Sequence, residues 1–370
     1  MLLDRQDRSI LGRWWRTVDP YLLLAFSGLI IIGGLMVTTA SPYVAERIGL
    51  DTFHFTIRQF VYLFISVFII FGISLLDPRK VRRLATVGFG LGLCMMVLVL
   101  LVGAEIKGST RWLSVGPLAI QPSEFMKPCF FVVVAWMFSE KLKNPEFPGY
   151  MLGTAIYLMV ALLLVLQPDI GTTVTLTAVW AGQFFLAGLP LFFIGIIAIV
   201  AIFAAIGAYL VFPHVAARVE KFTSPDSDEN YQVRKSLEAF SNGGLFGRGP
   251  GEGIVKKNIP DSHTDFIFAV IGEEMGLIVL LAVIGLFAFI IYRGFRTLEK
   301  SNDSFTIIAC AGILMNFGMQ AVINMGVSLK LFPTKGMTLP FVSYGGSSTL
   351  AMAFGVGILL ALTRKRYGKH

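Results

Sequence analysis

A nearly continuous apolar run, FIFAVIGEEMGLIVLLAVIGLFAFIIY, occupies residues 266–292. Two glutamates interrupt it, and its other residues are nearly all apolar. A helix that crosses a membrane needs roughly 20 mostly apolar residues, so this stretch predicts one membrane-spanning helix. The chain of 370 residues is 55% hydrophobic and only 15% charged, whereas a soluble domain has about 25% charged residues. The sequence therefore predicts an all-α polytopic membrane protein.

Nine further segments share this pattern, which predicts a bundle of ten transmembrane helices. The predicted spans are residues 20–40, 56–76, 84–103, 122–138, 151–166, 170–187, 190–212, 264–292, 305–329 and 338–362. The first is longer than the apolar core of a cleaved signal peptide, about 7–15 residues, so we expect it to be retained. Residues 1–370 then form one membrane domain with a large extracytoplasmic loop at 213–263. The three cysteines lie in apolar runs and indicate neither a disulfide framework nor a metal site.

The distribution of basic residues predicts the orientation in the membrane. With the N-terminus inside, the inner segments hold seventeen Lys and Arg residues, and the short outer loops hold five. The long loop at 213–263 adds seven outside, but long loops follow this rule less well. Both termini are therefore expected in the cytoplasm. The net charge of +8 is mainly a topology signal, and we expect no nucleic-acid partner.

A polar cluster, DSHTD at residues 261–265, stands at the start of the 264–292 span. A carboxylate is costly to place at the mouth of a membrane helix, which makes Asp265 a candidate catalytic residue. Partial desolvation raises the proton affinity of a carboxylate and suits Asp265 to act as a general base near neutral pH. The alternative is a helix cap, because free N–H groups and the helix dipole favour Asp there. His263 could orient a substrate, or it could simply be solvated.

Two other features surround this cluster. Glu273 and Glu274 lie about 80° and 180° around the helix from Asp265, so both cannot face the same cavity. We expect each to form a structural pair. The glycine-rich segment 243–253 matches neither a Walker loop nor a dinucleotide fingerprint, and a flexible lid is its expected use.

Charged residues in other segments give candidate substrate contacts. Glu124 and Lys127 are three residues apart in one predicted span and can pair on one helix face. Such a pair is the least costly way to keep charge in a membrane, so a structural pair is the alternative to substrate binding. Asp169 precedes the 170–187 span and is expected to be an ordinary N-cap. Arg111, beside Trp112 in an outer loop, is suited to hold a phosphate through two hydrogen bonds.

Lys335 is a further basic residue in an outer loop. Together, Asp265, Arg111 and Lys335 place one acid and two bases on the outer face. This charge pattern suits a hydroxyl acceptor and a diphosphate leaving group.

Four short motifs occur in the order typical of one family: QPSE (121–124), QPDIGT (167–172), HTDFIFA (263–269) and SYGGS (343–347). On these motifs the chain resembles the SEDS family of peptidoglycan glycosyltransferases (shape, elongation, division and sporulation proteins) over nearly its whole length. The run PTKG at 333–336 is more similar to the division branch, FtsW, than to the elongation branch, RodA. Two departures are Asp261, where many relatives have Glu, and Lys257, near which some division members carry an acid.

The resemblance implies a ten-helix bundle in the bacterial inner membrane, with the division septum as its place of action. It implies polymerisation of lipid II by an inverting reaction in which undecaprenyl diphosphate leaves. Asp265 matches the catalytic aspartate of the family, and Arg111 and Lys335 match positions in the same outer cavity. We add His263 and the Glu124–Lys127 pair as predicted substrate contacts.

The resemblance also implies partners, and it leaves alternatives open. The expected partners are a class B penicillin-binding transpeptidase, other membrane proteins of the divisome, and the undecaprenyl-linked glycan itself. The sequence indicates no bound metal, although a divalent cation, Mg²⁺ or Mn²⁺, could assist the leaving group. The alternative functions are a lipid II flippase with the same charges along its path, and a scaffold that recruits division proteins.

Overall fold

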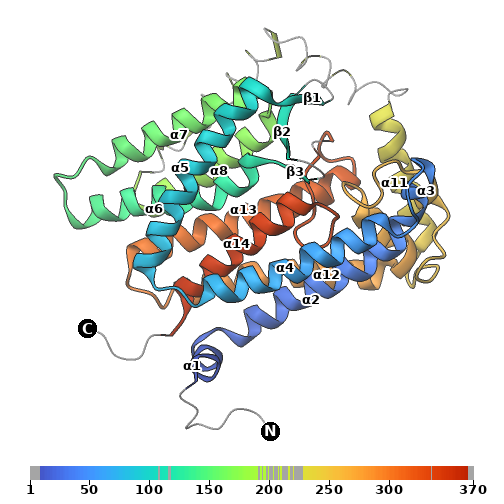
Figure 1. Ribbon diagram of the computed structural model, residues 1–370, viewed down its shortest axis with the longest axis horizontal. Coiled ribbons are helices and arrows are strands. Elements are labelled where there is room, and N and C mark those ends of the chain that lie inside the picture. Colours follow the sequence, from blue (N-terminus) through green and yellow to red (C-terminus); the bar gives the residue numbers. More distant parts are fainter. Residues whose placement is uncertain are drawn as a thin grey trace.

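The computed structural model describes residues 9–106, 109–115, 118–190, 228–334 and 336–365, and positions 192, 193, 195, 196, 199, 203, 207, 209, 210, 216 and 220. Its elements, in chain order, are α1 (Ile10–Thr17), α2 (Pro20–Ala40), α3 (Pro42–Arg47), α4 (His54–Ser74), α5 (Pro78–Val102), β1 (Ala104–Ile106), β2 (Ser109–Val115), β3 (Leu118–Ile120), α6 (Pro122–Lys143), α7 (Gly149–Leu166), α8 (Ile170–Leu186), α11 (Asp228–Gly243), the 3₁₀ helix η1 (Val255–Asn258), α12 (Ile267–Leu298), α13 (Ser304–Ser328) and α14 (Gly346–Thr363). The long helices run roughly along the long axis, and α3 and α11 lie together at one end (Figure 1).

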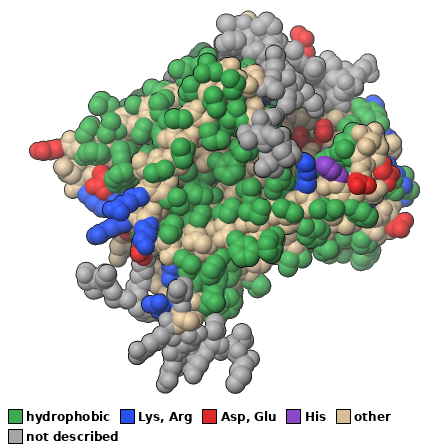
Figure 2. Space-filling view, in the orientation of Figure 1, with side chains coloured by type: hydrophobic (Ala, Val, Ile, Leu, Met, Phe, Trp, Pro, Cys, Tyr) green, Lys and Arg blue, Asp and Glu red, His purple; other side chains and the backbone are tan. Residues whose placement is uncertain are grey.

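The predicted class, a polytopic helical membrane protein, is confirmed. Among the described residues, seven helices are long and apolar enough to cross a membrane, and Ile170–Leu186 is a shorter apolar helix. α6 covers another predicted span and carries a Glu–Lys pair. Nine predicted spans thus coincide with helices, whereas most of the span at 190–212 lies outside the described residues. Hydrophobic side chains cover the middle of the face in Figure 2, and Lys and Arg gather where α5 begins and α6 ends.

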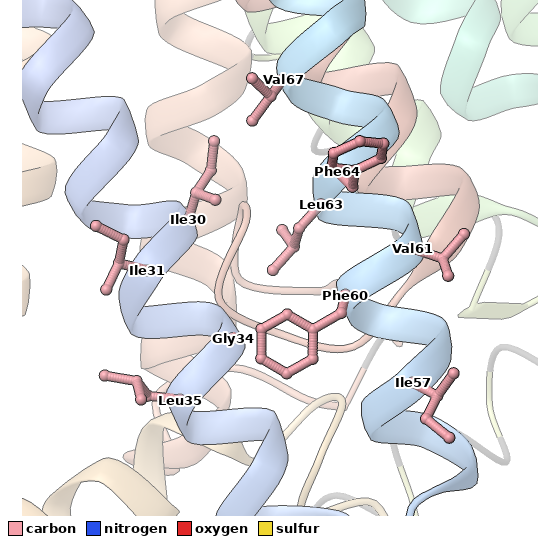
Figure 3. Close-up of a pocket in the computed structure, with 10 residues that line it drawn as sticks. All are labelled: Ile30, Ile31, Gly34, Leu35, Ile57, Phe60, Val61, Leu63, Phe64 and Val67. Carbon is pink, nitrogen blue, oxygen red and sulfur yellow. The ribbon is translucent and has the colours of Figure 1, made fainter.

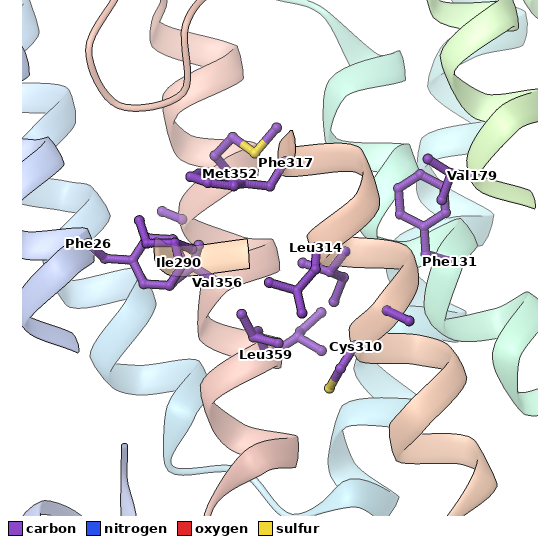
Figure 4. Packing of buried hydrophobic residues seen from close by; sticks show 14 of the residues in the cluster. Phe26, Phe131, Val179, Ile290, Cys310, Leu314, Phe317, Met352, Val356 and Leu359 are labelled. Carbon is purple, nitrogen blue, oxygen red and sulfur yellow. The ribbon is translucent and has the colours of Figure 1, made fainter. Parts of the chain in front are cut away.

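Helices α13 and α14 form the centre of the bundle. In the most apolar part of each helix, 78% of the residues are buried in α13 and 72% in α14. The corresponding share is only 28% in α4, α5, α7 and α12. Phe317 of α13 packs edge-on against Phe26 at a centroid distance of 5.5 Å and lies 5.3 Å from the ring of Phe287. Figure 4 shows this packing between α2, α13 and α14. The polar residues of α13 are therefore held inside the protein rather than in lipid.

The segment between α5 and α6, predicted as a plain outer loop, contains a small antiparallel sheet. Its strand order is β1-β2-β3, with Ala104 opposite Trp112 and Leu113 opposite Ile120. The short strands were missed because each is only three to seven residues long. The sheet carries Arg111 on its central strand.

Two predicted span boundaries were wrong near the candidate site. α12 begins at Ile267 and extends to Leu298, and α14 begins only at Gly346, so 338–345 is not part of the helix. Instead, the Ser343 hydroxyl accepts a hydrogen bond from the Leu339 amide at 2.8 Å, and Phe341 has a positive φ of 63°. This compact turn replaces the first two turns of the predicted helix.

Helix α12 is broken at Gly276, whose φ of 76° and ψ of 178° are not helical. The glycine-rich segment fills the break. The amides of Arg248 and Gly249 donate to the carbonyls of Glu273 and Glu274 at 3.0 and 2.9 Å, and the Leu277 amide donates to Gly244 at 3.0 Å. Backbone groups freed by the break are thereby satisfied, as a buried chain requires.

The expectation that the glycine-rich segment is a flexible lid was therefore wrong. Gly247 has a φ of 79°, and a Cβ there would stand 2.2 Å from the Glu274 carbonyl oxygen. A Cβ at Gly243 would stand 2.0 Å from the Gly272 carbonyl oxygen. The glycines serve close backbone contact rather than mobility.

Both glutamates of α12 form structural contacts, as predicted. Glu273 accepts hydrogen bonds from the amides of Ile254 and Val255, both at 2.8 Å, and from Lys256 at 3.0 Å. It therefore caps η1. Glu274 forms an ion pair with the Lys256 ammonium, and both side chains are almost completely buried. The ammonium also donates to the Thr39 carbonyl at 2.8 Å, so one buried network joins α2, η1 and α12.

Candidate active site

Asp265 closes a turn that is held by side chains from two distant parts of the chain. The Asn324 amide of α13 donates to the carbonyl of Asp265 at 3.0 Å and to that of Met337 at 2.7 Å. The Ser343 hydroxyl donates to the Thr264 carbonyl at 2.6 Å. Phe266 occupies the N-cap position of α12, so Asp265 stands one residue before the cap. The turn holds Asp265 at the mouth of the helix, as the sequence predicted.

The Asp265 carboxylate faces the loop that follows α13. A Cβ built at Gly336 would stand 4.0 Å from Asp265 Oδ2, and Gly336 has a φ of 67°. Lys335, the preceding residue, lies outside the described residues. The part of this loop that the structure places beside the half-buried carboxylate is therefore Gly336.

His263 is buried, not solvated, because only 6% of it is exposed. Its ring lies 4.5 Å from that of Phe55 and 5.5 Å from that of Tyr344. Its Nδ1 is buried and has no hydrogen-bond partner among the described residues. Burial, reinforced by Arg47 and opposed by Asp261, lowers the pKa of His263 to about 4. The imidazole is therefore neutral at neutral pH and can act as a hydrogen-bonding group, not as a cation.

This shift predicts a loss of stability in acid. Because the pKa is about 4 in the folded protein and about 6.5 when unfolded, only the unfolded chain gains a proton between these values. Stability is thus complete above pH 6.5 and falls as the pH drops towards 4. We expect the thermal unfolding temperature of His263→Gln to depend less on pH than that of the wild type between pH 7 and 5. Parallel curves for the two proteins would contradict this.

Arg58 is a site residue for which the sequence reasoning found no role. It lies in α4, is half-buried, and is close enough to the Tyr344 hydroxyl to affect it electrostatically. Tyr344 in turn donates its backbone amide to the His263 carbonyl at 2.9 Å. The signal that could have identified it is a lone arginine inside an apolar span, which is costly unless it has a partner or a ligand.

Arg111 is engaged by a second motif. Its guanidinium donates to the Pro168 carbonyl at 2.8 Å and lies 3.4 Å from Asp169 Oδ1. Asp169 accepts a hydrogen bond from the Thr172 amide at 3.2 Å, which confirms its prediction as an N-cap. Arg111 therefore joins the sheet to the turn before α8.

Glu124 and Lys127 form the buried pair that was the alternative to substrate binding. Their charged atoms are 2.8 Å apart, with side-chain exposures of 9% and 2%. The pair borders an enclosed cavity of about 10 Å³ that Asn316 also lines. A structural role is therefore evident, and substrate contact stays a prediction.

The described residues do not contain a group of three or more His, Cys, Asp or Glu side chains that could hold a metal ion. Mg²⁺ is commonly held by one or two carboxylates together with substrate phosphates, so a divalent cation stays a prediction and enters no step below.

Comparisons with known proteins identify the family of this chain. Residues 20–368 match the model of the FtsW/RodA/SpoVE family, described as cell cycle proteins. A protein of Caulobacter vibrioides, named as a probable peptidoglycan glycosyltransferase FtsW, is 45% identical, with 99% of this chain and 94% of that protein covered.

Two solved structures share the fold. A chain from a peptidoglycan synthase complex, described as coordinating polymerization and crosslinking, has a TM-score of 0.78 and 27% identity, with 94% of this chain and 97% of that chain covered. The rod shape determining protein RodA of Thermus thermophilus has a TM-score of 0.69 and 26% identity, with 96% of this chain and 99% of that chain covered. The chain therefore belongs to the FtsW/RodA/SpoVE family of cell cycle proteins, which the sequence motifs had indicated.

Proposed function

We propose that this protein is a peptidoglycan glycosyltransferase that polymerises lipid II at the outer face of the bacterial inner membrane. The names of its relatives support this activity. The observation that carries the proposal is the position of Asp265, a half-buried carboxylate at the mouth of α12 that faces the loop after α13. Placing a carboxylate at such a boundary costs free energy, so its presence there indicates a functional role.

Asp265 acts as the general base. One carboxylate oxygen takes the proton from the 4-hydroxyl of the acceptor GlcNAc. The hydroxyl oxygen then attacks the anomeric carbon of the MurNAc residue on the lipid-linked strand. The bond from that carbon to the diphosphate breaks, and the diphosphate leaves with the electron pair. A single in-line displacement converts the α-diphosphate into a β-1,4 link, with inversion.

Basic groups stabilise the leaving diphosphate, where negative charge develops. Lys335 is the chain neighbour of Gly336, which borders the Asp265 carboxylate. Arg111 acts from the sheet while Asp169 holds its orientation.

The setting follows from the same proposal. The excess of basic residues in the inner segments supports a cytoplasmic position for both termini, with α3, α11 and Asp265 outside. A class B penicillin-binding transpeptidase cross-links the new strand at the division septum, and other divisome membrane proteins recruit the pair. The test is the polymerisation of labelled lipid II by the purified protein together with its transpeptidase. Absence of glycan polymer with a transpeptidase of proven activity would overturn the proposal.

A flippase would depend on the same charges in a different way, so the two functions can be separated. The charged residues assigned to the site, Asp265, Arg111 and Lys335, are expected on the outer side of the membrane rather than along a continuous path across it. We expect vesicles that contain Asp265→Asn protein to translocate labelled lipid II as wild-type vesicles do. A clear loss of translocation in the variant, with no polymer from the wild type, would favour transport.

The leaving-group assignment predicts coupled losses. We expect Arg111→Ala and Lys335→Ala each to lower the initial polymerisation rate by about tenfold or more, equal to about 1.4 kcal/mol. If both hold one diphosphate, the double variant should lose less than the product of the single losses. Asp169→Asn is the matched control. It removes the carboxylate that pairs with Arg111 but keeps the guanidinium itself. Rates near wild type in Arg111→Ala would remove that residue from the site.

A further inference from the structure

A small enclosed cavity lies in the centre of the bundle, between α6, α13 and α14. Its polar lining is Glu124 and Lys127 of α6 and Asn316 of α13, and its apolar lining includes Phe131 and Met352, both labelled in Figure 4. The space open to the centre of a water molecule is about 10 Å³, which is enough for one water. The larger groove between α2 and α4, of about 750 Å³, differs because apolar side chains line it (Figure 3).

Two acceptor atoms of the cavity lining have no donor among the residues that the structure describes. They are Oε2 of Glu124 and Oδ1 of Asn316, and both atoms are buried. Glu124 is only 7% exposed and Asn316 only 5%, so bulk water does not reach these oxygens. A buried acceptor without a donor keeps the full cost of its desolvation, and nearly all buried polar groups in proteins are hydrogen-bonded. Both oxygens therefore indicate a bound hydrogen-bond donor.

The third polar group of the cavity limits what this donor can be. The Lys127 ammonium borders the same cavity, and one of its N–H groups donates to Glu124 Oε1 at 2.8 Å. A metal cation would stand beside this ammonium, and like charges repel strongly at short range in a protein interior. A water molecule can donate to two acceptors and accept from Lys127, and buried waters typically make about three hydrogen bonds. The lining thus matches one water in size and in bonding.

We propose that this cavity binds one structural water molecule. The water donates to Glu124 Oε2 and to Asn316 Oδ1, and it accepts from the Lys127 ammonium. It thereby joins α6, which directly follows the small sheet, to α13. Asn324 lies two turns further along α13, and its amide holds the Asp265 carbonyl. The water therefore bridges the helix that holds the Asp265 turn and the helix that follows the sheet. The site does not depend on the proposed function, and its tests need no turnover.

Radiolytic footprinting detects such a water directly, because X-rays split water into hydroxyl radicals that oxidise only nearby side chains. Met352 lines the cavity and is 6% exposed. The matched control is Met126 of α6, which is 0% exposed and lies outside the lining. The full chain in detergent is equilibrated with isotopically labelled water and irradiated. We expect at least about threefold more labelled sulfoxide at Met352 than at Met126, because the bound water lies beside Met352. Equal yields would show a dry cavity and overturn the proposal.

Gly355→Ala gives the second arm, because its methyl group would enter the cavity. Gly355 lines the cavity, and a Cβ there would stand 3.5 Å from Ile313 Cγ2 and 3.6 Å from Pro128 Cβ, so the methyl group fits without a clash. It would displace the water and leave the two acceptors without a donor. We therefore expect the thermal unfolding temperature to fall by about 2 °C or more. The sulfoxide yield at Met352 should fall to that at Met126.

The matched control is Gly285→Ala in α12, where a Cβ would meet nothing within 4 Å. Alanine favours a helix over glycine, so this variant should unfold at the wild-type temperature or above it. In a dry cavity Gly355→Ala would only fill empty space, and an equal rise in its unfolding temperature would overturn the proposal. A wild-type unfolding temperature that rises with Na⁺, without such a rise in Gly355→Ala, would assign the cavity to a cation instead. The wild-type sulfoxide yields decide the matter if Gly355→Ala folds poorly.

Discussion

Asp265→Asn protein is expected to fold normally and to polymerise lipid II at least about 100-fold more slowly than the wild type. Asparagine keeps the size of the side chain but cannot accept the hydroxyl proton, and general-base assistance contributes about 10²–10⁴-fold to a rate. The contacts that hold the turn are to backbone carbonyls of Asp265 and Thr264, so the substitution leaves them in place. Initial rates with labelled lipid II, measured with the transpeptidase present, test this.

The matched control is Asp261→Asn, in the same turn and similarly half-buried. It removes an equal charge four residues away and should keep most of the activity. Comparable losses in the two variants would point to the charge of the turn rather than to a base at position 265. A well-folded Asp265→Asn protein with a rate near wild type would defeat the mechanism outright.

The second large effect concerns stability. Glu274→Ala leaves the Lys256 ammonium buried and unpaired, which costs about 3–5 kcal/mol. The pair is almost completely excluded from solvent, so water cannot replace the lost carboxylate. We expect a marked fall in the thermal unfolding temperature in detergent, together with earlier proteolysis of the outer segment 228–262.

Two comparisons separate the charge effect from a simple loss of packing. Glu274→Ala combined with Lys256→Met should recover much of the stability, because no buried charge then remains unpaired. Glu238→Ala breaks the exposed Lys235–Glu238 pair, in which the side chains are 23% and 49% exposed, and should cost no more than about 1 kcal/mol. Equal unfolding temperatures for Glu238→Ala and Glu274→Ala would contradict the prediction.

Most of the membrane architecture could be predicted from the sequence, because a long apolar run is enough to predict a membrane-spanning helix. The segment 20–40 matches α2 residue for residue. The errors lie where apolar residues do not form a helix. In 338–345 the residues are apolar or small enough to extend a span, yet Ser343 ties them to Thr264 across 79 positions. No local sequence pattern predicts a hydrogen bond between residues so far apart in the chain.

The candidate site was predictable in part for the same reason. Asp265 and the Asp169 cap follow from local rules about charge at helix ends. The pairing of Glu273 and Glu274 could be expected, but not their partners, which belong to the 254–256 segment. The role of the glycine-rich segment was misjudged because glycine supports both mobility and close backbone contact. Only the break in α12 at Gly276, which the glycine-rich segment fills, shows that close backbone contact applies here.

The two networks around Asp265 differ in how much of the chain each requires, and this bears on the order of assembly. Lys256 and Glu274 are separated by 18 residues, so the outer segment and α12 can dock as soon as α12 has entered the membrane. Asn324 reaches Asp265 across 59 residues and Ser343 reaches Thr264 across 79. Local contacts form early in folding and distant ones late. In a ribosome-bound chain that ends after α12, the outer segment would therefore be docked, but the turn that positions the Asp265 carboxylate would not yet be held. The nascent protein is expected to remain inactive until the segments that carry Asn324 and Ser343 have folded.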